Sequence, residues 1–227
     1  MSASNKLLDG LKEIGIPENK ITDLADKMDK YIGEIILFNS AYNLVNTSDY
    51  DEIVTNHILD SLSAWKELVA LANQIEQQQS IKFADIGSGG GLPGIPLAAA
   101  MPEFNWTLVE RMDKRCAFLE NCAAILGLKN VSVMKKEAEK VPPQSFDIAT
   151  FRAFRPLDEK MTKTLLSLTK DGGFLAAYKA KEDSIRVEMN GIKHLVSQYK
   201  AIPLIVPGLT DKSDREKRDR NLILIKK

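Results

Sequence analysis

Residues 81–94 (IKFADIGSGGGLPG) form the segment that most constrains the fold of this chain. A short apolar run ends abruptly at Gly87, four more glycines follow, and an apolar, helix-like stretch (LPGIPLAAAM) comes next. A strand, a glycine-rich loop and a helix in this order let the backbone approach a nucleotide-like ligand closely. The segment therefore predicts an α/β domain with such a ligand site, although an ordinary glycine-rich turn would give a similar pattern.

From residue 81 onward, apolar runs of strand length alternate with longer helix-like segments. The predicted strands are 81–86, 105–110, 131–134, 146–151, 173–178, 201–206 and 221–226, and the predicted helices are 93–101, 112–126, 156–169 and 182–191. This alternation predicts an α/β fold with a mostly parallel, seven-stranded sheet and helices on both faces.

The first part of the chain has a different, purely helical periodicity. Amphipathic stripes run through 7–14 and 24–36, and a third helical face covers 53–62. We therefore expect two parts: an N-terminal helical extension, 1–75, that packs on the main domain, and a ligand-binding domain, 76–227.

The composition bounds the possible function only broadly. The 31 basic and 31 acidic residues balance, so net charge neither favours nor excludes a nucleic-acid partner. No stretch approaches the roughly 20 apolar residues of a membrane-spanning helix, and no signal peptide is predicted. Cys116 and Cys122 are expected on opposite sides of one helix and unpaired, which favours a cytoplasmic protein. With two histidines and no cluster of ligands, no metal site is predicted.

The register of the glycines separates two classes of ligand. A dinucleotide motif, G-x-G-x-x-G, fits only from Gly89 through Gly91 to Gly94, which would extend the strand beyond its apolar run. An acid followed by G-x-G-x-G, here Asp85, Gly87, Gly89 and Gly91, keeps the strand end where the hydrophobicity ends. That order is typical of methyltransferases that use S-adenosylmethionine, whose cationic sulfonium tolerates a nearby acid. An NAD(P)-binding oxidoreductase remains the rival interpretation.

Residues at the ends of the following strands provide further candidate contacts with the cofactor. Glu110 ends the second strand and is expected to accept hydrogen bonds from the ribose hydroxyls, unless it only caps a strand edge. Ala138 and Glu139 follow the third strand, where an adenine edge would lie, although Glu139 is equally consistent with an exposed helix acid. Arg152 ends the fourth strand and is delivered to the ligand crevice.

Several longer motifs make the interpretation more specific. DIGSGGGLPGIPLA, LVERMDKRCAFLE, FDIATFRAFRPL and YKAK together resemble the RsmG (GidB) family, and YNLVNTSDYDEIVTNHILDS resembles its N-terminal signature. The resemblance runs from about residue 35 to the C-terminus. It implies a Rossmann-like fold, S-adenosylmethionine as the cofactor, and methylation of guanine N7 in 16S ribosomal RNA, either as RNA or as the small ribosomal subunit.

The resemblance also assigns roles to single residues. It places Gly87 and Leu92 in the cofactor loop, Ala138 and Glu139 beside the adenine, and Arg152 at the arginine of the fourth strand. Basic positions associated with activity or RNA contact correspond to Lys114, Arg115, Lys179 and Arg220, which as plain residues would be solvated surface charges. The chain departs from the family at Glu137, where arginine is usual, and at Arg220-Asn221, where histidine is common.

The expected chemistry needs no acid or base. Guanine N7 carries a lone pair and no proton, so catalysis would rest on proximity and alignment. His57 is interpreted as a packing or capping residue, and Phe154 as either a stacking face for RNA or a core residue. A methyltransferase with another substrate and a non-catalytic RNA-binding assembly factor remain alternatives. We expect a monomer, although the sequence does not fix the oligomeric state.

Overall fold

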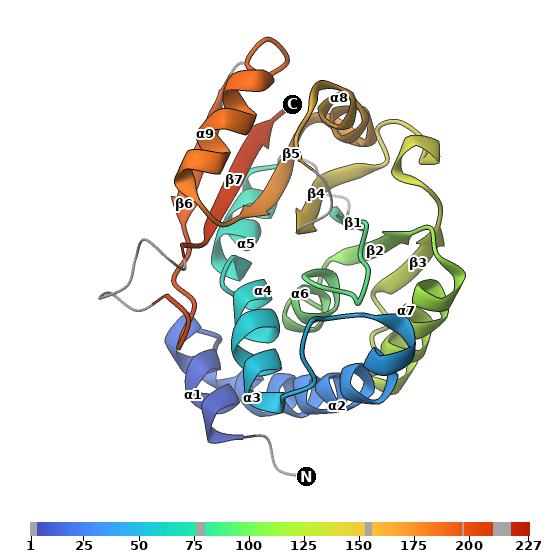
Figure 1. The fold of residues 1–227 in the computed structure, drawn as a ribbon, viewed down its shortest axis with the longest axis vertical. Coiled ribbons are helices and arrows are strands. Elements are labelled where there is room, and N and C mark those ends of the chain that lie inside the picture. Colours follow the sequence, from blue (N-terminus) through green and yellow to red (C-terminus); the bar gives the residue numbers. More distant parts are fainter. Residues whose placement is uncertain (1–3, 76–79, 153–155, 197, 211–218) are drawn as a thin grey trace.

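The computed structural model describes residues 4–75, 80–152, 156–196, 198–210 and 219–227. Its centre is a seven-stranded sheet in the order β3-β2-β1-β4-β5-β7-β6 (Figure 1). The strands are β1 (Lys82–Ile86), β2 (Asn105–Glu110), β3 (Val131–Lys135), β4 (Phe146–Arg152), β5 (Thr169–Lys179), β6 (Tyr199–Pro203) and β7 (Asn221–Lys226). Strand β7 is antiparallel to both its neighbours, and the other pairs are parallel, so the predicted sheet is confirmed.

Two strands differ from their predicted limits by more than one residue. Strand β5 starts at Thr169 because the chain passes directly from the preceding helix into pairing with Phe146, before a register shift in the ladder. Strand β6 ends at Pro203, since the backbone then turns: the amides of Leu209 and Thr210 both bond to the Val206 carbonyl oxygen, at 3.0 Å each. Both differences come from backbone pairing that side-chain periodicity does not report.

The helices fall into two groups along the chain. The N-terminal extension contains α1 (Asn5–Ile14), α2 (Glu18–Tyr42), α3 (Tyr50–Ile53), a π-helical turn η1 (Val54–Leu59), α4 (Asp60–Leu62) and α5 (Trp65–Gln74). The main domain contains α6 (Gly94–Ala100), α7 (Asp113–Ile125), the 3-10 turn η2 (Ala138–Lys140), α8 (Glu159–Leu168) and α9 (Glu182–Gly191). Within the described ranges, none of these helices has the length and apolar character needed to cross a membrane.

Two apolar clusters cover the two faces of the sheet. One contains the buried residues of α6, α7 and the N-terminal extension, and the other those of α8 and α9. Successive side chains of β4 point to opposite faces of the sheet, so Ile148 belongs to the first cluster, and Ala149 and Phe151 belong to the second. Cys116 and Cys122 of α7 are buried and unpaired, as expected.

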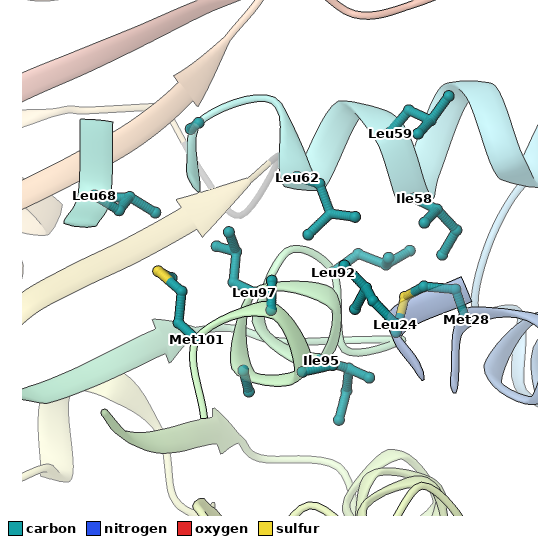
Figure 2. Packing of buried hydrophobic residues seen from close by; sticks show 14 of the residues in the cluster. Leu24, Met28, Ile58, Leu59, Leu62, Leu68, Leu92, Ile95, Leu97 and Met101 are labelled. Carbon is teal, nitrogen blue, oxygen red and sulfur yellow. The ribbon is translucent and has the colours of Figure 1, made fainter. Parts of the chain in front are cut away.

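The N-terminal extension shares its core with the main domain. In Figure 1, α2 runs along the lower edge of the view and α3–α5 rise past α6. Figure 2 shows side chains of the extension beside those of α6 and its flanking residues. The labelled residues are Leu24, Met28, Ile58, Leu59, Leu62 and Leu68 of the extension, and Leu92, Ile95, Leu97 and Met101 in or next to α6. One continuous cluster thus joins the extension to the sheet, while the division after residue 75 stays a prediction.

Candidate active site

Four predicted residues meet at the carboxyl ends of neighbouring parallel strands. Gly87 follows β1, Glu110 ends β2, Arg152 ends β4 and Lys179 ends β5. Between β1 and β4 the order of the sheet reverses, and such a switch point is where open α/β sheets bind ligands. The fold therefore brings these four residues to one edge of the sheet.

Two adjoining cavities open at this edge. The first, of about 420 Å³, lies between the glycine loop and the turn after β3, and its lining includes Gly87, Glu110, Ala138 and Glu139. The second, of about 570 Å³, is lined by the other side of the loop, by the extension and by the basic ends of the strands. Gly87 and Arg115 line both cavities, so the two cavities adjoin at these residues.

The glycine loop needs its glycines for conformation and for space. Gly87, Gly89 and Gly91 have φ values of 70°, 56° and 89°, in the left-handed region that side chains disfavour. A Cβ on Gly91 would lie 2.7 Å from Ile95 Cγ1 and 2.9 Å from Tyr31 Oη. Substitution at Gly91 must therefore move the loop or the helices behind it.

The extension holds the glycine loop from behind. The hydroxyl of Tyr31, on α2, donates a hydrogen bond to the Gly90 carbonyl oxygen. Burial raises the pKa of Tyr31 well above its ordinary value, so the hydroxyl keeps its proton and remains a donor. Leu44, just after α2, packs over Gly90. The extension is therefore part of the site and not only a cover for the sheet.

Asp85 lies behind the loop, away from both cavities. It is 1% exposed, and its Oδ2 accepts a hydrogen bond from the Gly94 amide at 3.1 Å. Burial raises its pKa to about 7, and the hydrogen bond from Gly94 opposes part of that shift. Because Asp85 lines neither cavity, any contribution to ligand binding acts through the loop and the start of α6.

Glu110 ties the loops after β1 and β2 together. Its carboxylate accepts hydrogen bonds from the amides of Gly89 at 2.9 Å, Arg111 at 2.8 Å and Met112 at 3.0 Å. A carboxylate offers about four acceptor sites, so these three bonds leave one for a ligand. Bonds to both ribose hydroxyls, as the sequence suggested, would require one of the backbone bonds to give way.

The other predicted cofactor residues divide between the cavities. Ala138 and the exposed Glu139 form the wall of the first cavity opposite the loop. Leu92 lines the second cavity. Lys114 is exposed on the first turn of α7 and lines neither cavity, so the fold does not bring it to the other predicted residues.

Arg115 lies where the two cavities adjoin. Its Nη2 donates to the Asn43 carbonyl oxygen at 3.3 Å, which links α7 to the extension. Its Nε is buried and has no hydrogen-bond partner among the described residues. A hydrogen-bond acceptor of a ligand bound there would supply the partner that Arg115 Nε lacks.

A buried carboxylate of the extension joins two of the predicted arginines. Asp60, 4% exposed, accepts from Arg152 Nη1 at 2.8 Å and from Arg220 Nε at 3.1 Å. All three residues line the second cavity, together with Lys179, whose Nζ lies 2.6 Å from Glu188 Oε2. Arg152, which we expected among the cofactor contacts, therefore lies in the second cavity beside Lys179 and Arg220, and all three have counter-charges within the protein.

His57 completes this network. Arg152 Nη2 lies 3.3 Å from His57 Nδ1, and an arginine only donates, so Nδ1 is the acceptor and Nε2 carries the proton. Burial, followed by the charges of Arg152 and Arg220, lowers the pKa of His57 to about 4. The residue is thus neutral near pH 7 and contributes a contact with Arg152 beyond the packing role that we expected.

Asp60 is the site residue that the sequence reasoning missed. The HILDS segment contributed only an apolar helical face to the prediction, although two arginines at strand ends would need a counter-charge once partly buried. Phe154, the proposed stacking residue, lies outside the described residues. No group of three or more potential metal ligands occurs in the described part of the chain.

The start of α6 argues against a dinucleotide. A pyrophosphate in a dinucleotide-binding fold sits on the amides at the start of the helix after the first strand. Here the Gly94 amide bonds to the Asp85 carboxylate, and a Cβ at Gly94 would lie 2.7 Å from its Oδ2. Because a buried acid occupies that position, the geometry disfavours the NAD(P) interpretation.

Comparison with solved structures identifies the fold. The tRNA methyltransferase TrmI from Aquifex aeolicus superposes with a TM-score of 0.53 at 14% identity, over 74% of this chain and 67% of that one. A precorrin-6y C5,15-methyltransferase from Geobacter metallireducens gives a TM-score of 0.50 at 13% identity, over 70% of this chain and 87% of that one. The fold is therefore the Rossmann-like methyltransferase fold.

Comparison of sequences identifies the family. The chain is 39% identical to the ribosomal RNA small subunit methyltransferase G of Treponema denticola, over 97% of this chain and 93% of that protein. It is 33% identical to the protein of the same name from Borreliella burgdorferi, over 88% of each. The family model GidB, rRNA small subunit methyltransferase G, matches residues 24–218. The chain belongs to this family.

Proposed function

We propose that this protein transfers the methyl group of S-adenosylmethionine to N7 of a guanine in 16S ribosomal RNA. One observation carries the proposal: the cavity between the glycine loop and the turn after β3 shares Gly87 and Arg115 with a second cavity, which is walled by arginine and lysine. A cofactor in the first cavity would present its reactive end to a polyanionic substrate in the second. Membership of the family supports ribosomal RNA as that substrate.

The first cavity has the features that this cofactor requires. Gly87 brings bare backbone to its wall, Glu110 keeps one acceptor site for a ribose hydroxyl, and Ala138 leaves room for the adenine. Its volume of about 420 Å³ lies within the range of nucleoside-sized pockets. When bound there, S-adenosylmethionine supplies an electrophilic methyl group.

The residues of the second cavity position the substrate and do not move protons. Guanine N7 would accept the methyl group through its lone pair, with S-adenosylhomocysteine as the leaving group, and the product guanine would carry the positive charge. Additional positive charge against the base would oppose this step, so Arg152 and Arg220, joined by Asp60, are assigned to phosphate contacts. Nδ1 of His57 already accepts from Arg152 and Nε2 carries the proton, so the ring has no free lone pair with which to act as a general base.

A labelling experiment separates this function from its rivals. The protein is incubated with methyl-labelled S-adenosylmethionine and small subunits, or 16S RNA, from cells that lack the modification. Label in 16S RNA, saturating at one methyl group per molecule, is expected. Tight cofactor binding without RNA labelling would indicate another substrate, and RNA binding that ignores the cofactor would indicate an assembly factor.

The setting of the proposed reaction follows from its substrate. Ribosomal subunits occupy the cytoplasm, and we assign the protein to that compartment. We further propose that it acts as a monomer. Light scattering during size-exclusion chromatography tests the monomer, and a dimer that persists at the assay concentration would contradict it.

A further inference from the structure

A third cavity, of about 600 Å³, adjoins the second one. It lies between the α3–η1 segment and the turn after β6, and we call it the side groove. Its own lining includes Asn46, Asp51, Glu52, Thr55, Gly208 and Leu209. It also shares Asn56, His57 and Arg220 with the second cavity, so these residues form the boundary between the two cavities.

Arg220 is held at the boundary between the two cavities. Its Nε donates to Asp60 Oδ1 at 3.1 Å, and the other oxygen of the same buried carboxylate holds Arg152 at 2.8 Å. A guanidinium that is fixed in this way is pre-organised to bind a phosphate. The phosphate that links two successive nucleotides would fit at such a boundary, with one nucleoside on each side.

The charges of the side groove suit a base and not a second phosphate. Lys6 and Arg220 are matched by Asp51 and Glu52, and Lys6 Nζ lies 3.7 Å from Asp51 Oδ2. The groove therefore has no surplus of positive charge. Carboxylates and amides, such as the side chain of Asn46, are the groups that recognise the donors and acceptors of a base edge.

Buried polar atoms without partners provide an independent indication of a ligand. Thr55 lines the side groove and is 6% exposed, and its hydroxyl has no hydrogen-bond partner among the described residues. His57 Nε2, at the border with the second cavity, is unpaired in the same sense. Threonine within a helix usually bonds to a carbonyl one turn earlier, so the unpaired hydroxyl calls for an explanation.

We propose that the side groove binds the base of the nucleotide next to the methylated guanine, with the linking phosphate on Arg220. This inference rests on the proposed function and adds a second base-binding site to it. Proteins that recognise single-stranded RNA commonly splay neighbouring bases apart and contact their edges. The enzyme would then require a particular neighbour of its target guanine, read by Thr55 and the groove carboxylates.

Binding of short oligonucleotides tests the groove directly. The full chain, saturated with S-adenosylhomocysteine, is titrated calorimetrically with guanosine 5′- and 3′-phosphate and with dinucleotides that place each base before or after guanosine. At least one dinucleotide is expected to bind about 10-fold or more tightly than the mononucleotide with the same phosphate. Equal affinity, or no measurable binding by any dinucleotide, would overturn the proposal.

Two variants connect that gain to the groove. Thr55→Val keeps the side-chain shape and removes only the unpaired hydroxyl, while Glu52→Tyr fills the groove from an exposed position. Both should reduce the dinucleotide to mononucleotide affinity, whereas Glu13→Tyr, on an exposed face of α1 outside the three cavities, should not. If both groove variants unfold normally and still bind the dinucleotide more tightly than the mononucleotide to the same extent as wild type, the assignment of the base to the side groove is refuted.

The same preparations distinguish failure of the groove from failure of the proposed function. In the labelling experiment with small subunits, the groove variants should raise KM for RNA several-fold and leave the affinity for S-adenosylhomocysteine unchanged. If wild type labels RNA but dinucleotides gain nothing over mononucleotides, only the groove is wrong. If wild type labels no RNA, the proposed function fails, and the titrations alone then decide on the groove.

Discussion

The Asp60→Ala variant gives the most informative test of how the site is held together. The Asp60 side chain is 5% exposed and bonds to Arg152 at 2.8 Å and Arg220 at 3.1 Å, whose side chains are 16% and 26% exposed. Removal of the carboxylate leaves two guanidinium groups together without their shared counter-charge. Loss of one partner from a buried ion pair costs about 3–5 kcal/mol, and water reaching the arginines lowers our expectation to about 2–4 kcal/mol.

Urea unfolding measures this loss. We expect a lower midpoint with an unchanged m-value. The matched control is Glu103→Ala, which removes the partner of Lys20 in an exposed pair with N–O distance 3.9 Å, and should change the unfolding free energy by only about 0.2–1 kcal/mol. RNA methylation should fall at least about 10-fold in Asp60→Ala, with cofactor affinity preserved, because Asp60 lines only the second cavity. A loss of stability no greater than that of the control would refute the reasoning.

Three further predictions concern the glycine loop. Tyr31→Phe removes the donor to the buried Gly90 carbonyl, so it should lower the free energy of unfolding by about 1–3 kcal/mol. It should also weaken S-adenosylhomocysteine binding in calorimetry, and full affinity would contradict the claim that Tyr31 supports the loop. Gly91→Ala should abolish cofactor binding in a thermal-shift assay, while Gly33→Ala, where a Cβ meets nothing within 4 Å, should bind normally and be no less stable. The pKa of Asp85 is raised from 3.8 to about 7, so between these pH values the native state holds a proton that the unfolded chain has lost. The free energy of unfolding should therefore fall as pH rises from about 4 to 7. In urea unfolding, the Asp85→Asn variant should show a weaker dependence of this free energy on pH than wild type. Parallel curves for the two proteins would contradict that assignment.

The sheet was predictable because buried parallel strands are apolar runs separated by polar turns. The glycine register was predictable as well, since three glycines adopt backbone angles that other residues avoid. The limits of β5 and β6 were missed because they depend on backbone pairing with distant strands and not on side-chain periodicity.

The contacts within the site were less accessible from sequence. Asp60 lies 92 and 160 residues from the arginines that it bonds, and nothing local in the HILDS segment specifies those partners. The three backbone bonds of Glu110 depend on the conformations of two loops, so its reduced capacity for ribose was not foreseeable. Lys114 and Arg115 are adjacent in sequence, but only Arg115 reaches the cavities, because successive helical residues face different directions.

The central claim is that the second cavity delivers guanine N7 to the methyl group. Its most direct test is mass spectrometry of nucleosides from 16S RNA of unmodified small subunits, after treatment with the protein and S-adenosylmethionine. We predict one equivalent of 7-methylguanosine per subunit, and none with the Gly91→Ala variant. Methylation at any other guanine atom or on another base, or no methylated nucleoside despite cofactor binding, would contradict the account.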